Sequence, residues 1–117
     1  MKLLFIGEER SQRAKDMGVY WADGRLAAKQ LFDALNHCGI DPKKCEFCNI
    51  FETGGRTKAK KFKGSVVAMG NKVQKELNKL KVSHLCIVHP AARGKIRKKW
   101  KYCRHVKRRL GKLLKVA

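Results

Sequence analysis

Four short apolar runs, each ending at a glycine or a polar residue, divide the chain and predict four strands. The first ends at Gly7 and the third ends at Gly70. Short apolar runs bounded in this way are typical of buried strands. The predicted strands are Lys2–Ile6, Cys45–Phe51, Ser65–Met69 and Val82–Val88.

Two segments between these runs have the apolar spacing of a helix. A helix at about 24–38 places Leu31, Phe32, Leu35 and Cys38 on one face. The second runs from Asn71, an expected N-cap, to Leu80. The two remaining connections are polar. Glu8–Asp23 is expected to form an irregular loop with at most one helical turn, and Thr53–Lys63 is expected to form an exposed basic loop.

The end of the chain predicts a basic amphipathic helical segment at about 91–115. Its apolar positions recur at steps of three and four, which is helical spacing. They are Ile96, Trp100, Cys103, Val106, Leu110 and Leu113. The pattern fits one helix or two joined near Lys101–Tyr102, packed on the sheet by this face. A helix lying on a membrane surface has the same pattern.

Strands that alternate with helices predict an α/β fold with a parallel sheet. We expect a three-layer α/β/α domain with four parallel strands that spans residues 1–117. Ligands of such sheets bind beyond the carboxyl ends of the strands. The residues that leave these ends are Gly7–Glu8, Asn49–Phe51, Gly70–Asn71 and His89–Pro90. A carboxylate, an amide and an imidazole should therefore converge on one edge.

The net charge of +20 is confined to one part of the chain. Residues 1–41 hold six acidic and six basic residues, whereas residues 42–117 hold 23 basic and three acidic ones. Such a surface favours a polyanion, because each phosphate contact releases counterions. We expect DNA or RNA as the partner, with a ribosome-associated or phosphate-binding role and attraction to a membrane surface as the alternatives.

The chain has an odd number of cysteines, five. No signal peptide or membrane span is predicted. Reduced thiols are therefore expected. We expect a monomer that is cytoplasmic or nucleoid-associated, with a viral or phage gene as a further hypothesis based on the short chain.

Five segments follow one another in a recognisable order: Gly7–Ser11, Gly18–Leu26, Cys48–Ile50, Val66–Gly70 and His89–Ala91. In this order they resemble motifs of the uracil-DNA glycosylase superfamily. The match covers about residues 2–100. Two departures stand out: Glu9–Arg10 replaces a Pro-Gly pair, and Ala91 replaces a serine. A short chain with these changes fits either a minimal enzyme or a derivative that binds without cleaving.

The resemblance implies two catalytic residues. Glu8 would orient water or stabilise the sugar cation, with Glu9 as a substitute, and His89 would donate a hydrogen bond to the departing base. The alternatives are that Glu8 pairs with Arg10 or Arg13 and that backbone groups hold His89.

Base recognition is assigned to three further residues. Trp21, with Tyr20 as its rival, would stack on an extruded base, and Asn49 would contact the Watson–Crick edge. Core packing for Trp21 and turn formation for Asn49 are the alternatives. The residues expected to contact the nucleic-acid backbone are Arg93, Lys95, Arg97 and Lys98.

No metal or other cofactor is expected. Cys45 and Cys48 have metal-like spacing, but residues i and i+3 of a strand point to opposite faces. The sequence thus predicts a monofunctional DNA glycosylase that flips out uracil or another modified base and hydrolyses its N-glycosidic bond. The alternative is a non-catalytic DNA- or RNA-binding protein with the same fold.

Overall fold

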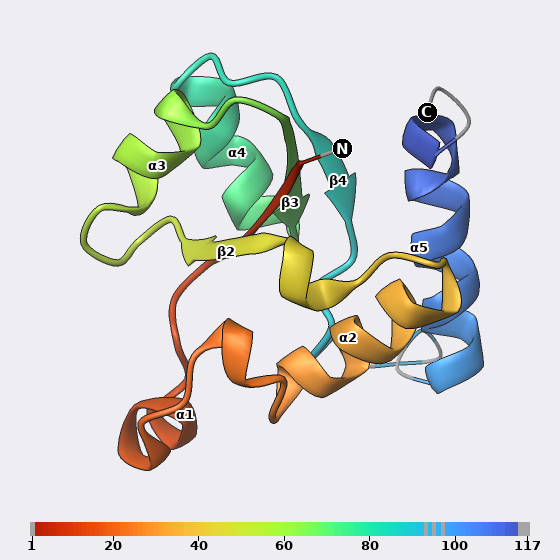
Figure 1. Ribbon diagram of the computed structural model, residues 1–117. Coiled ribbons are helices and arrows are strands. Elements are labelled where there is room, and N and C mark those ends of the chain that lie inside the picture. Colours follow the sequence, from red (N-terminus) through yellow and green to blue (C-terminus); the bar gives the residue numbers. More distant parts are fainter. Residues whose placement is uncertain (1, 93, 95, 97, 115–117) are drawn as a thin grey trace.

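The chain folds into a four-stranded, all-parallel sheet between two layers of helices (Figure 1). The computed structural model describes the backbone of residues 2–92, 94, 96 and 98–114, and the side chains of these residues up to 111. The strands are β1 (Leu3–Gly7), β2 (Glu46–Asn49), β3 (Ser65–Met69) and β4 (Leu85–Ile87), in the order β2-β1-β3-β4. The predicted α/β class and parallel sheet are confirmed.

The two central strands supply both halves of the core because their side chains alternate between the faces. On β1, Leu3 and Phe5 pack against α2 (Ala27–His37) and α5 (Lys99–Leu114). Leu4 and Ile6 face the other way, toward α3 (Gly55–Lys61) and α4 (Asn71–Lys79). Val67 and Met69 of β3 join the first cluster, and Val66 and Ala68 join the second.

The prediction of an exposed loop at 53–63 was wrong, because residues 55–61 form α3. The helix starts after Gly54, at φ 83°, and buries Ala59 against the sheet. Gly55 lies so close to the Asn49 carbonyl that a β-carbon would have no room. A single small apolar residue anchors this helix, so the hydrophobic period that would have revealed it is missing.

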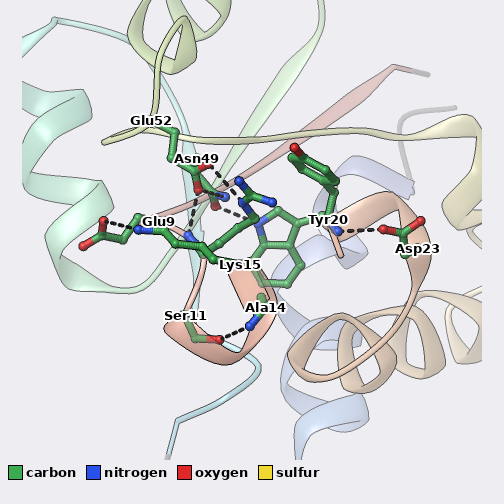
Figure 2. Close-up of polar contacts among 10 residues, drawn as sticks. Glu9, Ser11, Ala14, Lys15, Tyr20, Asp23, Asn49 and Glu52 are labelled. Atoms are coloured by element: carbon green, nitrogen blue, oxygen red, sulfur yellow. Dashed lines mark hydrogen bonds and ion pairs between the residues drawn. The ribbon is translucent and has the colours of Figure 1, made fainter. Parts of the chain in front are cut away.

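The segment between β1 and α2 contains more structure than predicted. Helix α1 (Gln12–Met17) is capped by Ser11, whose hydroxyl accepts a hydrogen bond from the Ala14 amide at 3.1 Å (Figure 2). A 3₁₀ turn follows at Trp21–Asp23. None of the α1 residues is buried, which explains why the pattern there was uninformative.

The expected N-cap at Asn71 was also wrong. Asn71 is already the first residue of α4, and Gly70 takes the cap position at φ 101° and ψ 166°. Only glycine adopts this conformation readily. The strand-to-helix turn at β3 is therefore made by backbone geometry, without a side-chain cap.

The C-terminal segment forms one continuous helix, α5, rather than two. Trp100, predicted on the core face, is 58% exposed, and Tyr102 is buried in its place. The buried stripe consists of Tyr102, Cys103, Val106 and Leu110. With 3.6 residues per turn, Trp100 lies about 60° outside the edge of this stripe. Ile96 packs against the same core as predicted, whereas the Leu113 side chain lies outside the described part.

Helix α5 also covers the outer edge of β4. The Tyr102 hydroxyl donates to the Val88 carbonyl at 2.7 Å, and the Val88 amide donates to His105 Nε2 at 3.0 Å. Arg109 Nε donates to the Cys86 carbonyl at 2.9 Å. These bonds occupy backbone groups that an edge strand would otherwise offer to another chain. In the described part of the chain, the helices are too short or too polar to cross a membrane.

Candidate functional site at the carboxyl edge of the sheet

The chain connections change direction at the carboxyl ends of β1 and β3. The chain leaves β1 toward β2 on one side, and leaves β3 toward β4 on the other. Ligands of parallel α/β sheets bind at such a reversal. Glu8 and Gly70 follow the two strands there, and the Glu8 carboxylate lies 3.9 Å from Lys72 Nζ.

A cavity of about 1010 Å³ opens at this edge. Four of the five predicted catalytic and base-binding residues line it: Glu8, Tyr20, Trp21 and His89. Asn49 instead lines a smaller neighbouring hollow of about 440 Å³, together with Tyr20 and Trp21. The two aromatic residues therefore border both spaces.

Asn49 is buried and hydrogen-bonded on both sides of its amide. Its Oδ1 accepts a bond from Trp21 Nε1 at 2.7 Å, and its Nδ2 donates to Glu52 Oε2 at 2.7 Å (Figure 2). The same Glu52 oxygen accepts a bond from the Arg10 amide at 2.7 Å. Asn49 thus connects the indole to the segment that follows Glu8. Its Oδ1 and Nδ2, the atoms predicted to contact a Watson–Crick edge, are both bonded within the protein.

Glu52 is a member of this network that the sequence analysis missed. Its other oxygen lies 3.3 Å from Arg10 Nε, and the Arg10 guanidinium lies 4.1 Å from the centre of the Tyr20 ring. The available signal was its position three residues after Asn49, beside the same strand end. Arg10 therefore pairs with Glu52, and not with Glu8 as the alternative interpretation of Glu8 supposed.

Gly7 is the point of closest approach between β1 and this network. A β-carbon there would lie 2.6 Å from Asn49 Oδ1 and 2.8 Å from Trp21 Cζ2. The glycine lets the Trp21–Asn49 pair pack directly against the end of the strand. This requirement explains why the first apolar run stops at a residue without a side chain.

His89 lies on the Trp21 side of the cavity, largely buried. The two rings are 5.8 Å apart and meet edge to face at 63°. The Ala91 amide donates to His89 Nδ1 at 3.0 Å, so Nδ1 is the unprotonated nitrogen. Burial lowers the pKa of His89, and Glu8 opposes this with a smaller upward effect on that pKa. Near neutral pH the ring is therefore uncharged, with its proton on Nε2.

Glu8 is reachable from solvent, with a side chain that is 36% exposed. It stands at the end of the buried strand β1, and its carbonyl accepts a bond from the Phe51 amide at 3.0 Å. The backbone is thereby fixed while the carboxylate stays accessible to water. Glu9, its proposed substitute, is exposed on the same cavity and lies 3.8 Å from Lys15 Nζ.

The cavity wall carries cations that the sequence analysis did not assign to nucleic-acid binding. Most of them belong to residues 1–41, where acidic and basic residues are equal in number and no nucleic-acid contact was predicted from the net charge. These residues are Arg10, Arg13, Lys15, Arg25, Lys29 and Lys99. Of the predicted backbone contacts, Lys98 is exposed beside Lys99. The other three, Arg93, Lys95 and Arg97, lie outside the described residues.

The cysteines give no indication of a metal centre. Burial raises the pKa of both Cys45 and Cys48 to about 11, which keeps the thiols protonated at neutral pH. Among residues whose placement is described, no three His, Cys, Asp or Glu side chains come together as metal ligands would.

Comparison of the chain with protein-family models, with curated proteins and with solved structures gives no match. Functional inference therefore depends on the site itself.

Proposed function

We propose that the protein binds DNA, receives an extruded base in the large cavity and hydrolyses its N-glycosidic bond. The observation that carries the proposal is the meeting of Glu8, Trp21 and His89 at one cavity, with cations around its wall. The motif order that resembles uracil-DNA glycosylases supports the same assignment. Uracil or another modified base is the proposed substrate.

The chemistry follows from the charges that develop during the reaction. The bond between C1′ of the sugar and the base nitrogen breaks, and its electron pair leaves with the base. The oxygen of a water molecule then bonds to C1′ and loses one proton, and the anionic base takes up a proton, which gives an abasic sugar and the free base. The site must therefore stabilise an anionic base and a cationic sugar at the same time.

His89 suits the first of these tasks. Its neutral ring holds a proton on Nε2, so it can donate a hydrogen bond to a carbonyl oxygen of the leaving base. Such a preorganised donor stabilises charge as it appears, and removal of one typically slows a reaction about 10²- to 10³-fold. Because Nδ1 is already occupied by the Ala91 amide, the ring orientation is fixed before substrate arrives.

Glu8 suits the second task. Its backbone is fixed at the end of β1, and its carboxylate is exposed enough to hold a water molecule. A negative charge at this place also stabilises positive charge on the sugar. Trp21 offers a flat surface, and its bond to Asn49 holds that surface in a fixed orientation.

A second candidate function is DNA or RNA binding without cleavage. It is favoured by Asn49, whose amide is engaged by Trp21 and Glu52 and so offers no free edge for reading a base. In the glycosylase proposal Asn49 therefore acts by holding Trp21.

The two functions separate in an assay on a uracil-containing oligonucleotide, followed by alkali to break the strand at abasic sites. We expect breakage with the wild-type protein and losses of about 10²-fold or more with Glu8→Gln and with His89→Ala. Matched controls are Glu76→Gln, which alters an acid on α4, and His37→Gln, which alters an exposed imidazole on α2. Binding without breakage would favour the second function, and undiminished breakage in both site variants would refute the site.

A further inference from the structure

Trp100 is a large apolar side chain that the fold leaves on the surface. It stands in the first turn of α5 and is 58% exposed. Two cations flank its ring: Lys101 Nζ lies 5.3 Å from the ring centre, and the Arg104 guanidinium lies 5.5 Å from it. An indole with cations beside it is suited to hold a flat, anionic ligand, because the ring can stack and the cations can pair with negative charge.

The outer face of α5 continues this arrangement along the helix. Trp100, Arg104 and Lys107 follow one another at helical spacing, and all three are exposed. The sequence from Leu77 to the end contains no Asp or Glu. Among the described ion pairs, α5 contributes only Lys99, which lies 3.5 Å from Asp33. The face therefore carries positive charge that the protein itself leaves uncompensated.

The first turn of α5 borders the cavity. Lys99 lines the cavity wall, and Trp100 is the next residue on the helix. Tyr20, an exposed aromatic residue that does line the cavity, also has a cation over its ring, the guanidinium of Arg10. An aromatic ring paired with a cation thus occurs both in the cavity and next to it.

We propose that Trp100 stacks with an unpaired base of single-stranded DNA, while Arg104 and Lys101 bind the adjoining phosphates. This inference rests on the proposed function, because the strand held here is the one that continues from the nucleotide in the cavity. A base can replace the cations over the ring, and the cations then turn to the phosphates. Single-stranded DNA is the occupant because bases in a duplex already stack on one another.

The test is affinity for an all-thymine single strand, at one fixed salt concentration. It contains no uracil, so the result does not depend on base release. Stacking on one aromatic ring predicts that Trp100→Ala weakens binding about 5- to 100-fold, whereas Trp100→Phe retains most of the affinity. Met17→Ala serves as the matched control, since Met17 is also an exposed apolar residue at 39%.

Two further measurements distinguish stacking from charge. Heparin carries dense negative charge without bases. The affinity of Trp100→Ala for heparin should therefore differ from that of the wild type by less than twofold. Single-stranded DNA should quench the tryptophan fluorescence of the wild type more than that of Trp100→Phe, in which only Trp21 emits. The proposal would be overturned if wild type and Trp100→Ala bound the thymine strand with equal affinity. It would also be overturned if Trp100→Ala lost as much affinity for heparin as for the thymine strand. A catalytic failure with intact stacking would refute only the proposed function.

Discussion

The indole nitrogen of Trp21 donates a 2.7 Å hydrogen bond to the side-chain oxygen of Asn49, across 28 positions of sequence. This bond joins the turn before α2 to the end of β2. It gives the cavity an aromatic wall that is already oriented, which reduces the ordering cost of binding.

Replacing Asn49 with Ala should destabilise the fold by about 1–3 kcal/mol, because the Trp21 and Glu52 groups lose a buried partner. Urea unfolding followed by circular dichroism measures the change. Asn36→Ala, at an exposed position on α2, is the control and should stay within about 0.5 kcal/mol of wild type. Equal stability of the two variants would show that the network contributes nothing to the fold.

Replacing Glu52 with Ala should loosen the segment that follows Glu8. The Arg10 amide donates to the Glu52 carboxylate at 2.7 Å, and this bond would disappear. Hydrogen–deuterium exchange should therefore become faster at the Arg10 amide. Glu46→Ala removes an exposed partner of Lys58 and should leave that amide unchanged. Unchanged exchange at Arg10 in the Glu52 variant would contradict the assigned role.

Two glycine substitutions should have opposite effects on stability. Gly7→Ala places a methyl group against Asn49 and Trp21, and overpacking of this kind costs about 1–3 kcal/mol. Gly111→Ala lies within α5 where, apart from the helix's own backbone, no atom of the described residues is within 4 Å of the added carbon, so it should stabilise the fold by about 0.5–1 kcal/mol. Thermal unfolding of both variants tests the pair. A neutral Gly7→Ala would mean that Trp21 and Asn49 have room to move.

Stability should fall as the pH is lowered below about 6.5, the pKa of histidine in an unfolded chain. Burial lowers the pKa of His105, with Arg108 and Arg109 adding to the effect, and burial also lowers the pKa of His89. The unfolded chain therefore takes up protons first, so the stabilisation is present above pH 6.5 and is lost as the pH falls through the folded pKa values.

Urea unfolding of wild type and His105→Gln between pH 7.5 and 5 measures the His105 part of this effect. The variant should lose less stability over that interval, because its side chain does not titrate. An identical pH dependence in the two proteins would show that the bond from the Val88 amide to His105 Nε2 does not link protonation to folding.

The sheet and the convergence of its strand ends were predictable from sequence for a physical reason. β1 and β3 are buried on both faces, so their apolar runs are uninterrupted and end sharply at Gly7 and Gly70. Parallel connection then forces the following residues to one edge. Glu8 and His89 could be placed together on that ground alone.

Features that depend on tertiary contacts were not predictable in this way. Helix α3 is held by Ala59 and by the close approach of Gly55 to β2, neither of which leaves a hydrophobic period. Trp100 fits the helical spacing but lies outside the stripe that the sheet covers. The bond between Asn49 and Trp21 joins segments 28 positions apart, which spacing does not reveal. Glu52, three residues after Asn49, was the one member of this network that sequence position could have indicated.

The central claim is that the cavity at the carboxyl edge releases a base from DNA. A mass-spectrometric screen for free base, using oligonucleotides that differ in a single modified base, tests it most directly. The account predicts that at least one base, with uracil first, is released by the wild-type protein and is absent with a Glu8→Gln, His89→Ala double variant. Tight binding of every oligonucleotide with no base released from any of them would contradict it.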